Sequence, residues 1–245
     1  MSVEIPAARA EEARAHMIEL FPNGFEEIER ADGVELVAYT DPGGEERLWK
    51  VFGHTSASDV ADGWAERWRE FHRPVRVGQL WVGQPWQEPP ADAISIVIDP
   101  GRAFGTGAHP TTRLCLELLA GIPRAGVVDV GCGSGVLAIS AAKLGFAPVT
   151  AIDVDEHAVA AARRNVAAND AAVSVRGADA LDGAPIADIA IVNVTRDVVE
   201  AVARQRRWRT FIASGYLVSE PTAVNGYRHV ERAAEAGWAA DLFVR

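Results

Sequence analysis

The sequence predicts an α/β protein, with a doubly wound sheet as its main part and a small α+β domain before it. From residue 94 onward, apolar segments of strand length alternate with segments of helical periodicity, as in such a sheet. A glycine-rich loop follows the apolar strand predicted at 126–130, where the first strand of such a domain turns into its first helix. Residues 1–55 instead show short strands around a single helix.

Residues 1–55 are therefore expected to form the small N-terminal domain. A helix is predicted over 10–20, because Ala13, Met17 and Leu20 lie on one face. The strands of this domain are predicted at 3–5, 25–29, 34–39 and 47–52, with turns at 22–24, 31–33 and 41–44.

Residues 56–90 are expected to link the two domains. Ser58 is a suitable N-cap for a helix that runs to about residue 71. One apolar stripe on this helix indicates a packed face rather than a ligand site, and it consists of Val60, Trp64, Trp68 and Phe71. Prolines then interrupt regular structure up to residue 90.

Residues 91–245 are expected to form the doubly wound domain. Its strand at 126–130 is continuously apolar, as is typical of a strand buried on both faces of a parallel sheet. Gly145 closes the helix predicted at 136–144, and Asp155 caps the helix that follows the strand at 149–152. The other strands are predicted at 94–98, 149–152, 173–176, 189–192, 210–213 and 238–244, and the helices at 111–120, 136–144, 155–169 and 195–204.

Composition narrows the class of protein. The formal net charge of −10 disfavours general nucleic-acid binding and suits a basic protein partner, although solubility alone is the simpler explanation. No apolar stretch of about 20 residues and no signal peptide are found, so no membrane association is expected. Cys115 and Cys132 form neither a disulfide framework nor a metal-binding spacing. We therefore expect a cytoplasmic protein without a metal site.

Asp129, Gly131, Gly133 and Gly135 form a loop of alternating glycines between an apolar strand and the next helix. Glycine permits a tight turn and lets backbone N–H groups come close to a ligand. Asp153 ends the following strand about 20 residues later, where a carboxylate can accept hydrogen bonds from both hydroxyls of a ribose. Together these residues predict a nucleoside cofactor rather than a plain turn beside a capping acid.

The spacing of this loop favours S-adenosylmethionine (SAM) as the cofactor. Dinucleotide-binding folds use G-x-G-x-x-G, which leaves room for a diphosphate at the helix N-terminus. Here the third glycine comes one residue earlier, and the carboxylate of Asp129 would repel a diphosphate. That carboxylate can instead accept a hydrogen bond from the methionine ammonium of SAM. An NAD-linked oxidoreductase is the alternative.

Two polar residues after later strands are candidates for further cofactor contacts. Asp179 is placed to reach the adenine amino group, and an ordinary loop acid is equally consistent with its position. Asn193 follows the strand at 189–192, beside the first strand at the switch point of the sheet. We expect its side chain to face the reactive end of the cofactor rather than only to form a turn.

The segment at 99–112, DPGRAFGTGAHPTT, is far more specific than the glycine loop. It closely resembles the pre-catalytic loop of the bacterial methyltransferases that modify ribosomal protein L11 of the large subunit. The match continues through 129–145, 152–155, Asn193 and 214–215, and it covers the chain from about residue 64 to the end.

This resemblance implies a class I SAM methyltransferase with a Rossmann-like sheet and an N-terminal substrate-recognition domain. It further implies a monomer that transfers methyl groups to lysine side-chain amines and an N-terminal amine of the ribosomal protein. By motif matching, the SAM contacts would include Thr112, Gly131, Asp153 and Asn193.

By the same resemblance, Phe104 and His109 would belong to the loop that closes over the cofactor. His109 is a candidate base for the acceptor amine, and a role in stabilising the loop is at least as consistent. Cys132 is interpreted as a small filler of the glycine loop rather than as a nucleophile. Methyl transfer to an amine requires alignment and a neutral nitrogen, and it requires neither a metal nor a covalent intermediate.

Two features depart from the pattern of this family. Residues 194–197 replace an apolar, proline-containing run after Asn193, and Ala108 stands where threonine is common. The first departure leaves other acceptors open, namely another protein, a small-molecule amine, or none in a non-catalytic SAM-binding module. Adenine-N6 and RNA cytosine-C5 methyltransferases are disfavoured, because neither proline nor cysteine follows Asn193.

The basic run at 204–209 is interpreted as a solvated helix end rather than as an RNA contact. Sequence-specific binding of nucleic acid is not expected.

Overall fold

The computed structural model describes residues 1–21, 25–30, 32–38, 42–53, 74–99, 107–220 and 224–245. By its internal contacts the chain divides into two compact units, Met1–Trp68 and Arg69–Arg245. The helix predicted over 58–71 and the predicted site residue Phe104 lie outside the described residues.

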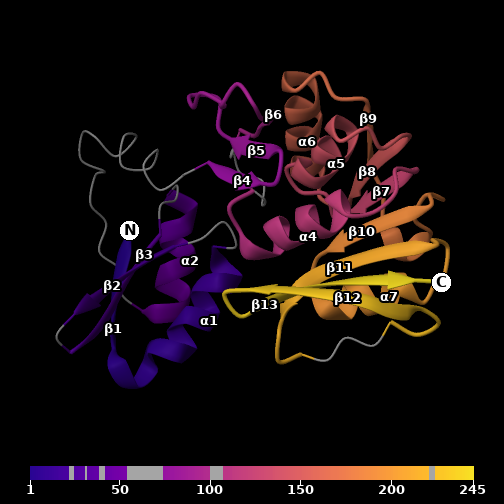
Figure 1. Cartoon of the computed structure of the whole chain (residues 1–245). Helices are drawn as coiled ribbons and strands as arrows, with labels where there is room; N and C mark the ends of the chain where they lie inside the picture. The colour runs from indigo at the N-terminus through magenta and orange to yellow at the C-terminus, as the bar shows by residue number, and fades with distance from the viewer. Residues whose placement is uncertain (22–24, 31, 39–41, 54–73, 100–106, 221–223) are drawn as a thin grey trace. The chain divides into compact units, whose positions relative to one another are not determined.

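The first unit is a three-stranded antiparallel sheet with two helices (Figure 1). The strands are arranged in the order β1-β3-β2, and the apolar side chains of β1, β3 and the helices form one core. Its elements are β1 (Ser2–Pro6), η1 (Ala7–Arg9), α1 (Ala10–Leu20), β2 (Glu26–Arg30), β3 (Gly33–Val37) and α2 (Pro42–Phe52). The predicted small α+β domain is thus confirmed as a fold.

One element of this unit was predicted wrongly. Residues 47–52 were expected to form a strand after a turn at 41–44, but Pro42–Phe52 is one helix. Leu48 is fully buried, and Phe52, four positions later, packs against the same core, which is helical periodicity. Proline is well tolerated at the first position of a helix, so Pro42 begins the element instead of forming a turn.

The second unit is built on a seven-stranded mixed sheet with the order β12-β13-β11-β10-β7-β8-β9. The five strands from β11 to β9 are parallel, and β13 and β12 add an antiparallel edge. The strands are β7 (Val127–Val130), β8 (Val149–Asp153), β9 (Val173–Gly177), β10 (Ile189–Asn193), β11 (Thr210–Leu217), β12 (Arg228–Glu235) and β13 (Trp238–Val244). The predicted doubly wound α/β class is confirmed.

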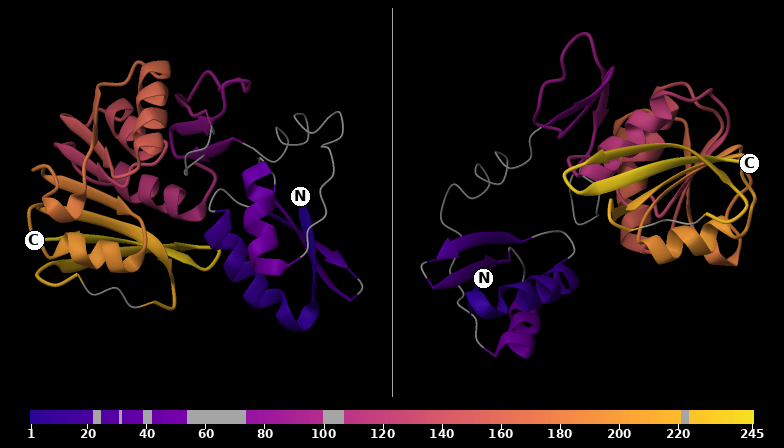
Figure 2. Two further views of the ribbon diagram at one scale, coloured as in Figure 1. Left: turned by 180° about the vertical axis from the view of Figure 1, so that it is seen from behind. Right: turned by 60° about the horizontal axis from the view of Figure 1, so that its bottom comes forward.

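Helices cover both faces of this sheet (Figures 1 and 2). One core joins the sheet to α4, α5 and α6, and a second core joins the opposite face to α7 and η2. The helices are α4 (Pro110–Ala120), α5 (Val136–Lys143), α6 (Glu156–Ala168), η2 (Ala180–Asp182) and α7 (Arg196–Ala203). Burial on both faces explains why the central strands have continuously apolar sequences.

Three strands of this unit were not predicted. β4 (Val75–Val77) and β5 (Leu80–Gly83) lie in the region expected to be a linker, and they pair with β6 (Ile94–Val97) in a small sheet. β12 has little apolar periodicity, because it is an edge strand with mostly exposed side chains. It forms a hairpin with β13 through Ala236 and Gly237, which both have positive φ.

Among the described residues, no helix combines the length and the apolar character needed to cross a membrane. Within the same part of the chain, no cluster of three His, Cys, Asp or Glu residues is arranged to hold a metal ion.

Candidate active site

The glycine loop after β7 is held by backbone hydrogen bonds within the protein. The N–H groups of Gly131 and Cys132 both donate to the carbonyl oxygen of Ile152, at 2.9 and 3.0 Å. The N–H of Gly133 donates to Oδ2 of Asp153 at 2.9 Å. In this structure the protein itself uses these N–H groups, so the loop is held in shape by its own neighbours.

The glycines of this loop are required for shape. Gly131 has φ +69°, and a Cβ there would lie 2.4 Å from Cγ1 of Val194. Gly135 has φ +83°, and a Cβ there would lie 3.2 Å from that of Ala162 on α6. Gly131 therefore permits close approach at the ligand side, whereas Gly135 permits close packing of the loop on α6.

Asp129 lies behind the loop, with 1% of its surface exposed. Its Oδ2 accepts a hydrogen bond of 3.0 Å from the N–H of Ala138 in the first turn of α5, and its buried Oδ1 has no partner among the described residues. Burial raises the pKa of Asp129 to about 7; the Ala138 bond opposes this rise, and the charge of Asp153 adds to it.

This carboxylate provides a test of which cofactor fits. In a dinucleotide-binding fold, the first helix N-terminus after the glycine loop receives the diphosphate. Here Asp129 occupies the N-terminus of α5, so a diphosphate would meet a carboxylate instead of free N–H donors. A cationic cofactor such as SAM would instead favour ionisation of a carboxyl group whose Oδ1 lacks a partner. The residues present therefore fit SAM and not a dinucleotide.

Asp153 and Asp179 lie at the same end of the sheet. Besides the Gly133 bond, Asp153 accepts a hydrogen bond of 3.0 Å through Oδ1 from the N–H of Asp155. Its carbonyl oxygen accepts one of 3.0 Å from Ala178, which brings the loop after β9 beside it. Asp179 is exposed and caps η2 by accepting from the N–H of Leu181 at 2.8 Å. Both acids thus support local structure, and each carboxylate oxygen keeps a further lone pair for a ligand.

A cavity lies where these segments meet. It is lined from α4, the glycine loop, α5 and the end of β10 by Thr112, Gly131, Cys132, Gly133, Val136, Leu137 and Asn193. Four of the predicted site residues, Thr112, Gly131, Gly133 and Asn193, are thus brought together from distant parts of the sequence. Cys132, Val136 and Leu137 were not predicted as contacts, although the first lies within the predicted loop. Burial and the nearby carboxylates raise the pKa of the Cys132 thiol, in keeping with its interpretation as a filler.

The segment that departs from the family pattern is accommodated without distortion of β10. The side chain of Val194 packs against Gly131. The carbonyl oxygen of Val194 would lie only 1.7 Å from a Cβ atom at Gly215. Arg196 begins α7 and lies 3.9 and 3.8 Å from the carboxylates of Glu200 and Glu220. The departure therefore changes the charge beside Asn193 while the packing on the glycine loop is kept.

His109 is the N-cap of α4. Its Nδ1 lies 2.8 Å from Oγ1 of Thr111 and accepts a hydrogen bond from the Thr111 N–H at 3.4 Å. Its ring packs edge-to-face on Trp238, with centroids 4.8 Å apart. Burial, assisted by the charge of Arg113, lowers the pKa of His109, which keeps the ring neutral near pH 7. These contacts favour the loop-stabilising role over that of a base.

The β12–β13 hairpin anchors the same helix start, which was not predicted. Arg113 forms a bidentate pair with Glu235 at 2.9 and 2.5 Å, and it also donates to the carbonyl oxygen of Ala108. Its hydrogen bonds lower the pKa of Glu235. The two residues are 122 positions apart, so no local pattern in the sequence indicates the pair.

Asn165 is a second unpredicted residue that positions the site. It is 2% exposed on α6; its Oδ1 accepts from the N–H of Asp99 at 3.1 Å, and its Nδ2 donates to the carbonyl oxygen of Ser134 at 2.9 Å. It therefore ties the start of the 99–112 segment to the glycine loop. An asparagine among the alanines of the buried helix face, such as Ala158 and Ala162, was the available signal.

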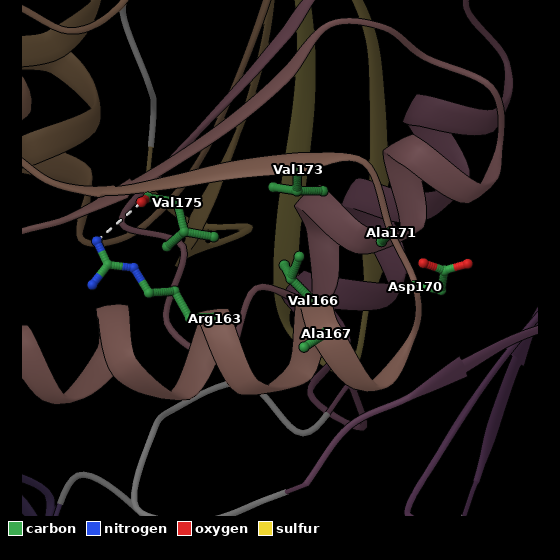
Figure 3. Close-up of a pocket in the computed structure, with 7 residues that line it drawn as sticks. All are labelled: Arg163, Val166, Ala167, Asp170, Ala171, Val173 and Val175. Carbon is green, nitrogen blue, oxygen red and sulfur yellow. Dashed lines mark hydrogen bonds between the residues drawn. The ribbon is translucent and has the colours of Figure 1, made fainter.

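A larger hollow lies elsewhere, between α6 and the edge strand β9 (Figure 3). Its volume is about 230 Å³, and it is lined mainly by aliphatic side chains, with Arg163 and Asp170 at its polar margin. Arg163 is engaged there with the carbonyl oxygen of Val175 at 3.2 Å. This hollow contains none of the predicted site residues, so we place the site at the smaller cavity.

Comparison with known proteins agrees with this geometry. The family model described as "Ribosomal protein L11 methyltransferase (PrmA)" matches residues 11–243. A ribosomal protein L11 methyltransferase of Geotalea uraniireducens is 40% identical over 222 residues, covering 77% of this chain and 70% of the relative. One from an Exiguobacterium strain is 35% identical over 235 residues, covering 84% and 75%.

Among solved structures, the ribosomal protein L11 methylase of Lactobacillus delbrueckii subsp. bulgaricus superposes with a TM-score of 0.64 at 25% identity. The superposition covers 71% of this chain and 99% of that one. With a family match over nearly its whole length, the chain belongs to the ribosomal protein L11 methyltransferase (PrmA) family of class I SAM methyltransferases.

Proposed function

We propose that the chain transfers methyl groups from SAM to ribosomal protein L11, on lysine side-chain amines and the N-terminal amine. The observation that carries this proposal is the cavity in which Thr112, the glycine loop and Asn193 meet in front of the buried carboxylate of Asp129. Family membership supports the acceptor.

In this proposal the acids at the end of the sheet hold the nucleoside. Asp153 would accept hydrogen bonds from the ribose hydroxyls while it fixes the glycine loop through Gly133. Asp179 would lie at the adenine, and Thr112 with the glycines would line the methionine end. When bound, SAM supplies an electrophilic methyl group on a sulfonium centre.

The protein's part in transfer is to align a neutral amine. The acceptor nitrogen forms its new bond to carbon with its lone pair as the carbon–sulfur bond breaks, and the nitrogen then loses a proton. A lysine of ordinary pKa, about 10.4, must lose one proton before this step. Asn193 would orient the nitrogen, because its amide oxygen can accept an N–H hydrogen bond without adding charge. Exclusion of water would favour the neutral amine.

We further propose that the N-terminal unit recognises the acceptor. Helix α2 presents Trp49, 58% exposed, and Val51, 40% exposed, and large apolar side chains at a surface are characteristic of binding sites. A monomeric state and a cytoplasmic location belong to the same proposal, and gel filtration tests the first.

The test is to incubate the purified chain with labelled SAM and either free L11 or total ribosomal protein and RNA. We expect label in L11, at amines that mass spectrometry identifies. Asn193→Ala tests the orienting role, because its loss of transfer should exceed its loss of SAM affinity in calorimetry.

Label in RNA would overturn the acceptor. Binding of SAM without transfer to any macromolecule or small amine would instead support a non-catalytic SAM-binding module. The unusual segment at 194–197 is the feature that favours this alternative. Thermal stabilisation by NAD rather than by SAM would overturn the cofactor.

A further inference from the structure

Four arginines gather at the end of the large sheet that lies opposite the cofactor cavity. They come from three separate segments: the turn after α7, the start of β12 and the end of β13. We call this set the arginine surface, and it consists of Arg206, Arg209, Arg228 and Arg245.

Backbone pairing brings these residues side by side. The N–H of Arg245 donates to the carbonyl oxygen of Arg209 at 2.8 Å, and Arg228 lies opposite Val244 in the β12–β13 ladder. Neighbouring strands are about 4.8 Å apart, so Arg245 and Arg209 lie side by side, whereas the side chain of Arg228, which pairs with Val244, starts from the other face at the same end of the sheet. Arg206 adjoins Arg245, whose guanidinium donates to its carbonyl oxygen, and its own guanidinium lies against Gly226, where a Cβ would be 2.5 Å from its Nε.

The charges of the arginine surface are not compensated within the described residues. All four side chains are exposed, and none forms an ion pair with a described carboxylate. Asp188 adjoins Arg209 only through its carbonyl oxygen, which accepts the Arg209 N–H at 2.9 Å. Several arginines elsewhere are paired, as in Arg14–Glu27, Arg76–Asp92 and Arg113–Glu235.

The net charge of −10 does not cancel this local potential. In about 0.1 M salt, charges more than about 10 Å apart are largely screened from one another. A ligand at the arginine surface therefore experiences mainly the nearby charges, which are the four guanidinium groups and the exposed carboxylate of Asp188 beside Arg209.

We propose that the arginine surface binds the phosphate backbone of double-helical RNA, which revises the interpretation of the run at 204–209 as only a solvated helix end, because the fold adds Arg228 and Arg245 to it. Arginine presents a planar fork that matches phosphate oxygens, and such contacts need no particular base sequence. The aromatic residues at this end do not offer a stacking platform for single strands. Trp208 is 1% exposed, and Tyr227 is half-buried with its hydroxyl bonded to the Trp208 carbonyl oxygen at 3.0 Å.

The same burial disfavours an anionic membrane as the partner. Membrane-surface binding combines basic residues with apolar side chains that insert below the headgroups. Neither Trp208 nor Tyr227 is available for insertion. Ile186, two positions before Asp188, is 84% exposed, but one aliphatic side chain offers little apolar area for insertion, so the arginine surface is better suited to a hydrophilic polyanion.

The position of the surface leaves the cavity open. Arg209 directly precedes β11, whereas Ser214, four residues into that strand, pairs with Asn193 at the cavity end. RNA held at the arginine surface would not cover the glycine loop. If the proposed function holds, this arrangement lets the enzyme engage RNA near a ribosomal acceptor while its site stays accessible.

The test uses the full chain and a fluorescently labelled RNA hairpin of arbitrary sequence, measured by anisotropy. The patch variant combines Arg209→Glu, Arg228→Glu and Arg245→Glu. The control variant combines Arg163→Glu, Arg164→Glu and Arg176→Glu, three exposed arginines of α6 and β9, so both variants have the same net charge.

We expect the affinity of the parent protein for the hairpin to fall by about 40- to 150-fold between about 50 and 200 mM salt, as release of counterions from three or four phosphate contacts predicts. The patch variant should bind at least about 10-fold more weakly and with a smaller salt dependence, and the control variant within about 3-fold of the parent. Arg228→Gln alone removes one charge without reversing it, and it should still weaken RNA binding. This single variant replaces the patch variant in the test if the patch variant does not fold.

Absence of binding by the parent at low salt would overturn the inference, as would equal losses in the two triple variants. Patch-dependent binding to phosphatidylserine vesicles that equals or exceeds binding to RNA would overturn it in favour of a lipid surface. Methylation of free L11 is measured in parallel and should be unchanged in the patch variant. Failure of methylation in the parent would concern the proposed function and not the arginine surface.

Discussion

At the carboxyl ends of β7 and β8, the sheet places two carboxylates against a loop of glycines, whereas at its other end exposed arginines line the ends of β12 and β13. The first region is built from buried groups and backbone hydrogen bonds, including those of Asp129 and Asp153. The second consists of long, exposed side chains, of which Arg245 donates to a backbone carbonyl oxygen and none forms an ion pair with a described carboxylate. At the cavity end, the atoms that stabilise the fold also form the proposed cofactor site. At the arginine surface, the proposed binding groups are not needed to stabilise the fold.

Substitution of Gly215 should give the largest effect. Gly215 has φ +100°, and a Cβ would lie 1.7 Å from the carbonyl oxygen of Val194, a backbone atom that cannot move without displacing β10. We expect Gly215→Ala to lower the free energy of unfolding by about 3–5 kcal/mol and to impair SAM binding. Urea denaturation and calorimetry measure the two effects, and an unperturbed variant would show that Val194 is not packed as described.

Asp129→Asn should stabilise the protein in the absence of SAM, in a pH-dependent manner. Burial raises the pKa of Asp129 from 3.8 to about 7, so between about pH 4 and 7 the folded protein keeps a proton that the unfolded chain releases. Stability therefore falls as pH rises through this window, and asparagine removes the loss while its oxygen can still accept the Ala138 N–H.

The free energy of unfolding of this variant should exceed that of the parent by up to about 4 kcal/mol at pH 8, and the difference should vanish near pH 4. Denaturation at several pH values measures it. A difference that does not change with pH would contradict the assignment to this carboxyl group.

Asn165→Ala should lower the free energy of unfolding by about 2–3 kcal/mol, because it leaves the Asp99 N–H and the Ser134 carbonyl without their buried partner. Chemical denaturation measures this loss, and Arg164→Ala on the exposed face of α6 is the control. If the two variants were equally stable, Asn165 would not tie these segments together.

Asp153→Ala should weaken SAM binding by about 1–3 kcal/mol, because the ribose hydroxyls and the Gly133 N–H lose a charged acceptor. Isothermal titration calorimetry gives the affinity, and circular dichroism checks that the variant is folded. Unchanged affinity would show that this carboxylate is not part of the cofactor site.

The smallest effect is expected at the arginine surface. Arg228→Ala removes an exposed side chain without an ion pair among the described residues, so the free energy of unfolding should change by less than about 0.5 kcal/mol. SAM affinity should also be unchanged. A large loss of stability would show that both ends of the sheet are structural, and the comparison drawn above would fail.

Most of the fold could be predicted from local patterns. Continuously apolar strands, the glycine loop and the capping residue Asp155 each act over a few positions, so α1, α4 to α7 and β7 to β10 were found close to their observed bounds, whereas β11, predicted over 210–213, runs to Leu217. Predictions failed where the local signal was weak: the strand expected at 47–52 is helical, and the exposed edge strand β12 has no clear periodicity.

The sequence by itself determined the fold class, the family resemblance and the residues that converge on the cavity, because parallel strands bring their carboxyl ends to one edge. Only the tertiary structure decided how those residues act. It showed that the glycine N–H groups are used internally, that Asp129 occupies a helix N-terminus, and that Glu235 and Asn165 hold the site from distant positions. Hydrogen bonds between residues far apart in the chain depend on how elements pack, and no local pattern records that packing.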